Sequence, residues 1–257
     1  MHKKLGNNKN IGLALGGGAV LGAAHIGVLR ALNEFNISIS YIAGTSIGAF
    51  VAAFYAFGKS CEEIREMTKD LNWLDVSEIS LSRYGLLSNK KLGEVITEGI
   101  GDVDFDQAAV PLAMIATDIA TGEKVILREG RVSTAAMAST CLPGIFRPVE
   151  IDERLLVDGG IVENVPITPL QEMGADVIIA VDLLAKRTYK KPENIIEVLV
   201  NTFNYTLIAA TKVQTEAADI LIQPDVSSFN MINTNQVNDL IEAGYAEAKT
   251  MLENNRD

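Results

Sequence analysis

The chain has 257 residues, of which 48% are hydrophobic, and its formal net charge at pH 7 is −11. A chain of this length and composition can bury a large core as a single domain, which argues against disorder. The acidic excess argues against binding to nucleic acid and against electrostatic capture by an anionic membrane. Two cysteines are too few for a disulfide framework and suit a reducing compartment.

The N-terminal residues carry three lysines, but no apolar segment long enough for a secretory signal follows them. The longest apolar stretch, residues 47–58, is well short of the ~18 residues that a membrane-spanning helix requires. We therefore predict a mobile tail over residues 1–10 and one domain over residues 11–257. The predicted location is cytoplasmic, with at most peripheral contact at a membrane.

Short apolar runs alternate with helical patterns along the chain, which is typical of an α/β fold with a parallel sheet and crossover helices. Residues 11–15 are predicted as a buried strand, and apolar residues at helical spacing follow from Val20 to Phe35. A second strand is predicted over residues 37–43. The almost wholly apolar residues 47–57 predict a buried helix.

The segment at residues 72–91 is less regular, because it mixes Trp73, Leu86 and Leu87 with serines and charged residues. We expect this segment to cover a pocket and to move. Farther along the chain, apolar runs and turn residues predict four more strands and a closing amphipathic helix. These elements are the paired strands at residues 111–117 and 124–127, the strands at 155–157 and 177–181, and the helix at 237–252.

The strongest functional signal is the segment Gly44-Thr45-Ser46-Ile47-Gly48. A G-x-S-x-G segment between a strand and a helix is typical of a nucleophile elbow, which lifts a serine into solvent. The amino terminus of the following helix also favours negative charge that develops beside the serine. The alternative is a glycine-bordered turn in which Ser46 only caps the helix. The predicted strand and helix on either side favour the catalytic interpretation.

A glycine run, Gly16, Gly17 and Gly18, connects the first predicted strand to the first helix. A dinucleotide-binding loop has different spacing and an acidic residue at the end of the second strand, which is missing here. A Walker-type phosphate loop is also excluded, because no Gly-Lys-Ser/Thr follows. Successive βα units place their strand ends on the same edge of the sheet, so the glycine amides can face a carbonyl attacked by Ser46. The loop is therefore predicted to form an oxyanion hole.

A serine nucleophile requires a base, and the chain has only two histidines. One lies in the predicted tail, and the other, His25, lies within the first helix, where a hydrogen-bonded structural ring is the simpler interpretation. A carboxylate is therefore the better candidate. Asp118 and Asp182 follow strands but are explained by turn or capping hydrogen bonds, whereas Asp158 precedes two glycines at a strand end. Burial near Ser46 would raise the pKa of Asp158 from ~3.9 and make it a usable base.

In these motifs the chain resembles the patatin-like phospholipases, a family of lipid acyl hydrolases with a Ser-Asp dyad. The resemblance extends from about Ile11 to Asp182, with weaker similarity in the closing helix. It implies a single-domain, three-layer α/β/α sandwich with a mainly parallel central sheet, related to but distinct from the α/β-hydrolase arrangement. The similar blocks are residues 13–18 with 24–29, 44–48, 116–118 with 121–123, 138–139 with 143–148, and 158–160.

The resemblance also implies roles for individual residues. Ser46 would be the nucleophile and Asp158 the general base, and the oxyanion hole would be lined by Gly17, Gly18 and Ala19. The implied reaction is hydrolysis of carboxyl esters of lipids through an acyl-enzyme, of the phospholipase A, lysophospholipase or esterase type, with no metal or cofactor. The expected partners are a lipid or ester substrate and, transiently, a membrane surface, but no nucleic acid.

Two positions depart from the family pattern. Leu21 stands where the glycine loop usually carries Lys or Arg, and Ala19 replaces a glycine. Without the cation, we expect neutral esters to be hydrolysed at least as well as phospholipids, and we expect Leu21→Arg to shift the preference toward phospholipids. Two alternatives remain: a catalytically weak lipid-binding or regulatory protein of the same fold, and a dinucleotide-binding oxidoreductase, which the missing acidic residue disfavours.

Overall fold

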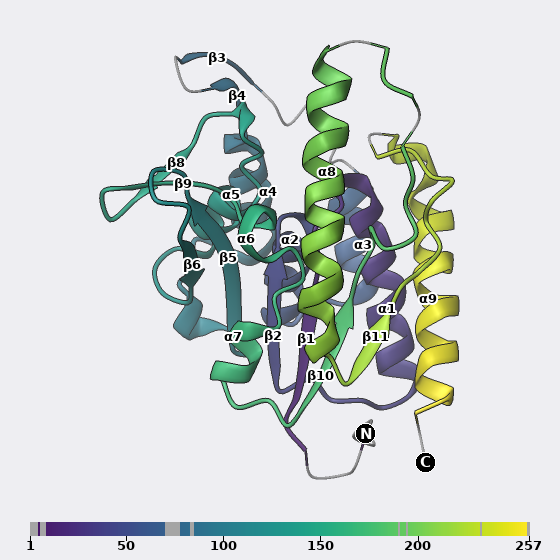
Figure 1. The fold of residues 1–257 in the computed structure, drawn as a ribbon. Coiled ribbons are helices and arrows are strands. Elements are labelled where there is room, and N and C mark those ends of the chain that lie inside the picture. Colours follow the sequence, from purple (N-terminus) through teal and green to yellow (C-terminus); the bar gives the residue numbers. More distant parts are fainter. Residues whose placement is uncertain are drawn as a thin grey trace.

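A computed structural model of the chain describes residues 5, 9–69, 78–82, 85–189, 191–193, 195–231 and 233–255. Its elements form three layers, with the central sheet between two layers of helices (Figure 1). The predicted three-layer α/β/α sandwich is therefore confirmed. The predicted tail over residues 1–10 lies mostly outside the described residues. The same holds for residues 72–77 and 83–84 of the segment expected to cover a pocket.

Strands and helices alternate along much of the described chain. The strands are β1 (Ile11–Leu15), β2 (Tyr41–Thr45), β3 (Glu78–Ser82), β4 (Gly85–Ser88), β5 (Leu112–Asp118), β6 (Lys124–Leu127), β7 (Gly144–Phe146), β8 (Val149–Ile151), β9 (Arg154–Asp158), β10 (Val177–Val181) and β11 (Ile220–Ile222). The α-helices are α1 (Ala23–Glu34), α2 (Ile47–Ala56), α3 (Cys61–Lys69), α4 (Lys90–Ile100), α5 (Val132–Ser139), α6 (Gly160–Glu163), α7 (Thr168–Glu172), α8 (Ile195–Gln214) and α9 (Val237–Glu253). The 3₁₀ helices are η1 (Ala19–Gly22), η2 (Phe105–Gln107), η3 (Thr215–Ala217) and η4 (Thr234–Gln236).

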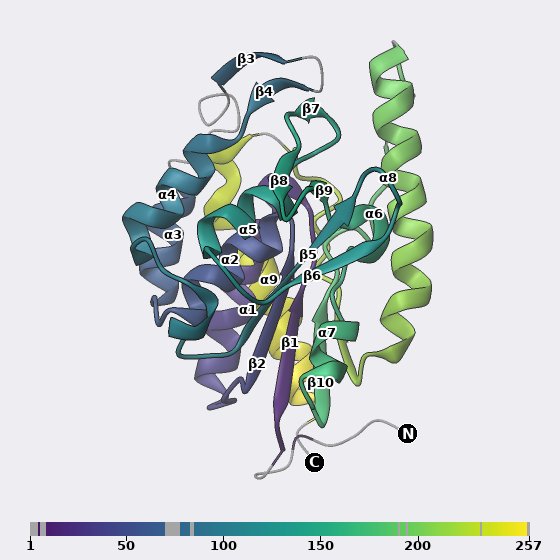
Figure 2. The same ribbon diagram turned by 90° about the vertical axis from the view of Figure 1, so that its left-hand side faces the viewer.

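The central sheet is mainly parallel. Strands β11, β10, β1, β2 and β5 pair in that order and run parallel. Strands β6 and β9 pair with β5 in antiparallel fashion, and β8 pairs in the same way with β9. The antiparallel pairing of β5 with β6 confirms the predicted strand pair at this place in the chain. Strands β3, β4 and β7 form a separate small sheet, seen at the top of Figure 2.

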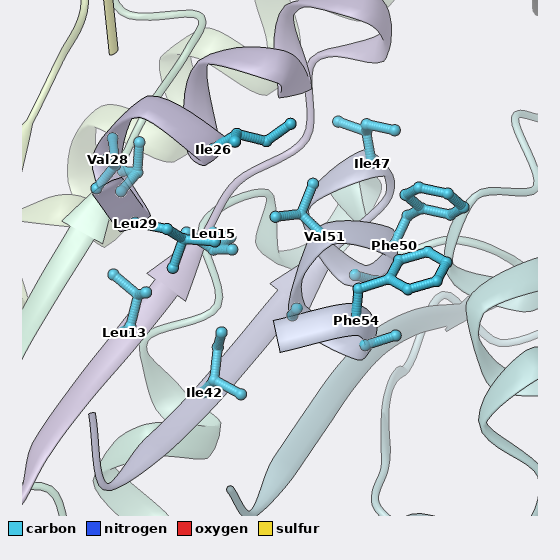
Figure 3. Close-up of a cluster of buried hydrophobic side chains, with 14 of the residues drawn as sticks. Leu13, Leu15, Ile26, Val28, Leu29, Ile42, Ile47, Phe50, Val51 and Phe54 are labelled. Carbon is cyan, nitrogen blue, oxygen red and sulfur yellow. The ribbon is translucent and has the colours of Figure 1, made fainter. Parts of the chain in front are cut away.

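Alternate residues of β1 face opposite layers of helices, as the period of a strand requires. Leu13 and Leu15 belong to the larger core cluster, together with residues of α1 and α2 (Figure 3). Ala14 belongs to a smaller cluster on the other face, which includes Leu170 of α7. Strands buried on both faces hold their carboxyl ends firmly, so this edge of the sheet can position side chains of the loops that follow.

Helices cover both faces of the sheet (Figure 2): α1 to α5 and α9 lie on one side, and α6 to α8 lie on the other. Helices α1 and α9 approach so closely that glycine is required at the contact. A Cβ at Gly27 of α1 would overlap the carbonyl oxygen of Ile241, and one at Gly244 of α9 would overlap that of Ala24. The last helix is therefore packed directly on the helix that follows the glycine loop.

Candidate active site

Ser46 lies in the turn between β2 and α2, with φ of 55° and ψ of −128°. Few residues other than glycine adopt this left-handed region, so the turn is strained. The flanking glycines are required by close backbone approach, because a Cβ at Gly44 would overlap the carbonyl oxygen of Gly48, and one at Gly48 would overlap that of Leu15. This is the strand–turn–helix geometry that the G-x-S-x-G segment predicts.

Asp158 reaches Ser46 because of the register of β5. Thr45, the last residue of β2, pairs with Ile115, and Asp158, the last residue of β9, pairs with the next residue of β5, Ala116. The ends of β2 and β9 therefore meet at one point of β5. There the hydroxyl of Ser46 donates a hydrogen bond to Oδ2 of Asp158 at 2.6 Å. The structure thus brings together the two residues that the sequence predicts as a dyad.

The carboxylate of Asp158 is buried, with 5% of the residue exposed. Its Oδ1 accepts a hydrogen bond from the amide of Gly160 at 2.8 Å, and its backbone carbonyl accepts one from the hydroxyl of Thr117 at 2.9 Å. Burial raises the pKa of Asp158 to about 6, although the hydrogen bonds from Ser46 and Gly160 lower it. A carboxylate with this pKa is a far better base near neutral pH than an exposed aspartate.

Two further hydrogen bonds hold the turn at Ser46, and neither was predicted from the sequence. The amide of Ser46 donates to the hydroxyl of Ser139, a fully buried residue of α5, at 2.9 Å. The hydroxyl of Thr45 donates to the carbonyl of Glu163 at 2.9 Å. Ser139 lies in one of the blocks that resemble the family, and this resemblance is the signal that could have marked it.

The glycine loop lies beside Ser46, but its amides are not all free. The amide of Gly17 donates to the carbonyl of Asn164 at 3.2 Å. Gly17 can therefore lie at the predicted oxyanion hole, but its N–H is not available as a donor there. Within the described residues, the amides of Gly18 and Ala19 have no hydrogen-bond partner. These two amides are the backbone donors that the loop can offer to a ligand.

Both departures from the family pattern have structural consequences. Ala19 has a φ of 52°, a conformation that costs an alanine more than a glycine. Leu21 is fully buried in the core, so its side chain does not face the pocket mouth. An arginine at this position would place a charge in the core, and the exchange Leu21→Arg therefore does not simply restore a cation to the site.

The other candidates have structural roles, as the sequence predicts. The ring of His25 is fully buried, and its Nε2–H donates to the carbonyl of Gly16 at 2.8 Å. Burial lowers the pKa of His25 to about 4, so the ring is neutral at pH 7. Asp118 and Asp182 each accept a hydrogen bond at 2.9 Å from the amide two residues downstream. None of these three contacts involves Ser46.

A small, mostly apolar depression lies next to the glycine loop and the turn at Ser46. It is lined by Ala19, Val20, Ala23, Ile47, Thr68, Thr234 and Val237. Across the described residues, His, Cys, Asp and Glu form no group of three or more that could hold a metal ion. In the same part of the chain, every helix is too short or too polar to cross a membrane.

Two relatives with similar sequences indicate the family to which the chain belongs. An uncharacterised NTE family protein of Mycobacterium tuberculosis is 36% identical over 180 residues, which cover 69% of this chain and 50% of the relative. The lysophospholipase NTE1 of Cryptococcus neoformans is 33% identical over 181 residues, which cover 68% of this chain and 11% of the relative. The chain therefore spans about half the length of the mycobacterial relative and a small part of the fungal one.

A solved structure and a family model agree with these relatives. VipD from Legionella pneumophila superposes with a TM-score of 0.66 at 13% identity, covering 96% of this chain and 67% of that one, which supports the fold alone. Residues 13–170 match the model of the patatin-like phospholipase family. This match covers more than half of the chain, including both Ser46 and Asp158. The chain thus belongs to the patatin-like phospholipase family.

Proposed function

We propose that this protein is a serine acyl hydrolase that cleaves carboxyl esters of lipids, with Ser46 as nucleophile and Asp158 as general base. The observation that carries the proposal is the 2.6 Å hydrogen bond from the Ser46 hydroxyl, in a strained turn, to the buried Asp158 carboxylate. A nucleophile and a base within hydrogen-bond reach form the minimal unit for nucleophilic catalysis. Membership of a family of lipid hydrolases supports the same reaction.

The reaction follows from this geometry in two steps. Asp158 accepts the proton of Ser46 while Oγ attacks the ester carbonyl, and the amides of Gly18 and Ala19 stabilise the resulting oxyanion. The bond to the leaving alcohol then breaks, and Asp158 returns the proton to the alcohol oxygen. In the second step, water attacks the acyl carbon, Asp158 takes the proton of the water and Ser46 regains it as the fatty acid leaves.

The chemistry of the surroundings favours a lipid ester as substrate. The depression beside Ala19 and Ile47 is small and mostly apolar, so it offers apolar contact for the part of a substrate next to the reacting carbonyl. Leu21 is buried and apolar, so it adds no attraction for a phosphate group. We therefore propose that the enzyme hydrolyses neutral lipid esters at least as well as phospholipids of the same acyl length.

A fluorophosphonate probe tests the proposal directly, because it reacts covalently with activated serines. We expect the probe to label the purified protein at Ser46, as identified by mass spectrometry of the labelled peptide. Ser46→Ala and Asp158→Asn should abolish labelling and lower kcat for p-nitrophenyl esters by several orders of magnitude. Ser60→Ala, a change at an exposed serine outside the site, is the control. Labelling elsewhere, or activity within about tenfold in Ser46→Ala, would refute the nucleophile.

A further inference from the structure

Asn164 is a buried polar residue whose side-chain nitrogen has no hydrogen-bond partner in the described part of the chain. Only 2% of the residue is exposed, and Nδ2 has no hydrogen-bond partner within the described residues. Leaving a buried donor unpaired costs ~1–3 kcal/mol, and such groups are rare in folded proteins. The backbone of Asn164 does have a structural role, because its carbonyl accepts the amide of Gly17. Any residue could supply that carbonyl, so the side chain requires a separate explanation.

The oxygen end of the Asn164 side chain lies beside the proposed catalytic pair. A Cβ at Gly17 would lie 2.7 Å from Oδ1 of Asn164 and 3.2 Å from Cβ of Ser46, so the amide and the nucleophile flank the same point. A Cβ at Gly160 would lie 3.1 Å from Oδ1 of Asp158 and 3.4 Å from Oδ1 of Asn164. The side chain of Asn164 is therefore next to both members of the Ser46–Asp158 pair.

The predicted oxyanion hole also has fewer backbone donors than the sequence indicates. The amide of Gly17 donates to the backbone carbonyl of Asn164, and the amide of Ser46 donates to the hydroxyl of Ser139. Gly18 and Ala19 are the donors left over in the described part of the glycine loop. A side-chain amide at this place can supply the missing donor, since rotation about χ2 exchanges the positions of its oxygen and nitrogen.

We propose that the side-chain N–H of Asn164 is a catalytic donor that binds the oxyanion formed when Ser46 attacks the ester carbonyl. In that step the bond from Ser46 Oγ to the acyl carbon forms, the carbonyl π electrons move to oxygen, and the serine proton passes to Asp158. Asn164 donates a hydrogen bond to the new oxyanion and keeps its own proton. After the rotation about χ2 the nitrogen takes the place of Oδ1, beside Gly17 and Ser46, and there its partner is the oxyanion that exists only during the reaction. This inference rests on the proposed serine hydrolase function.

Kinetics and inhibitor binding together test this role. We expect Asn164→Ala to lower kcat for a p-nitrophenyl ester by about 10²–10³-fold, the usual loss for one oxyanion donor, with KM changed by less than about threefold. Binding of an alkyl trifluoromethyl ketone, which adds to the serine and forms an oxyanion, should weaken by a similar factor. Binding of the corresponding non-reactive alkyl methyl ether should stay within about threefold.

Two further variants separate catalysis from folding. Asn164→Asp keeps the size of the side chain but presents a carboxylate, which repels an oxyanion, so its loss of kcat should equal or exceed that of Asn164→Ala. Asn89→Ala is the matched control, since Asn89 is also buried but donates to the carbonyl of Met137 at 2.7 Å. We expect this control to lower the unfolding midpoint and to leave the affinity for the trifluoromethyl ketone within about threefold.

The possible results discriminate between the two proposals. If the fluorophosphonate probe fails to label wild-type protein at Ser46, the serine hydrolase function is wrong. If wild-type protein is labelled but Asn164→Ala and Asn164→Asp keep kcat within about threefold, only the role of Asn164 is overturned. Equal weakening of the ketone and the ether would also overturn it, because that result indicates a change in ground-state binding and not in oxyanion stabilisation.

Discussion

The carboxylate of Asp158 is held away from water, and this single fact controls how activity depends on pH. Burial raises its pKa to about 6, and only the deprotonated form can accept the proton of Ser46. We expect kcat/KM to be constant above about pH 7 and to fall about tenfold per pH unit well below the pKa. A pH profile with a neutral ester substrate measures this. A profile that stays flat down to pH 4 would contradict Asp158 as the base.

The burial of Asp158, which favours its role as a base, lowers the stability of the folded protein at neutral pH. The pKa of Asp158 rises from its ordinary value of 3.8 to about 6 in the folded protein. The folded state therefore binds the proton more tightly, and the stability contributed by this group is present below pH 4 and lost as pH rises through 6. Asp158→Asn, which carries no charge, should raise the urea midpoint at pH 8 and leave it nearly unchanged at pH 4. A lower midpoint at pH 8 would contradict this.

The backbone conformation of Ala19 lowers the stability of the folded protein. Its φ of 52° is one that L-amino acids with a Cβ adopt at a cost of ~1–2 kcal/mol and glycine adopts freely. We expect Ala19→Gly to raise the free energy of unfolding by about 1 kcal/mol while kcat is retained. The control is Ala23→Gly, because Ala23 has helical angles and the same change there should destabilise the protein. Equal effects of the two changes in urea denaturation would refute strain at Ala19.

At the scale of elements, periodicity located both strands and helices. The helices predicted over residues 47–57 and 237–252 match α2 and α9 to within one residue, whereas the strand predicted over residues 37–43 is β2 at Tyr41–Thr45. The apolar runs at residues 11–15 and 177–181 coincide with β1 and β10, because these two strands are buried on both faces and carry no polar side chain. The run at residues 124–127 coincides with β6, although only Leu127 of that strand is buried. Helix α8 was not predicted. Its polar residues Asn204 and Thr211 are buried whereas several apolar ones are exposed, so polarity does not mark its buried face.

The candidate site was likewise predictable only in part. Ser46 and Asp158 carry local motifs, which a sequence displays directly. The hydrogen bond between them depends on the pairing of β2 and β9 at adjacent residues of β5, which no local pattern encodes. Ser139 and Asn164 were missed for the same reason, since their contacts join segments far apart in the chain.

The contact between α1 and α9 offers a test at the same scale. A Cβ at Gly27 would overlap the backbone of α9, so Gly27→Ala must force the two helices apart. We expect a loss of about 1–3 kcal/mol in the free energy of unfolding, typical of overpacking, although alanine is the better helix former. Ala246→Ser on the exposed face of α9 is the control, with an expected change below about 0.5 kcal/mol. An unchanged urea midpoint for Gly27→Ala would show that the helices tolerate separation.

For the whole molecule, the net charge of −11 limits how the protein can meet a lipid surface. Electrostatic attraction to anionic headgroups requires basic clusters, and an acidic protein is repelled by such a surface. We expect sedimentation with phosphatidylcholine vesicles to be at least as strong as with phosphatidylserine vesicles at low salt. Raising the salt concentration should not reduce either. Salt-sensitive binding to phosphatidylserine alone would reveal a basic surface that outweighs the net charge.

The glycine loop also depends on segments that follow it by more than 150 residues. The amide of Gly16 donates to Val181 at the end of β10, and the amide of Val20 donates to the carbonyl of Met231. The family match, in contrast, ends at residue 170. A fragment excised at that boundary would leave β1 as an edge strand paired with β2 alone, and it would remove these two hydrogen bonds to the loop. The part of the chain that identifies the family is therefore not a transferable module, and grafting or truncation experiments must keep the chain through α9.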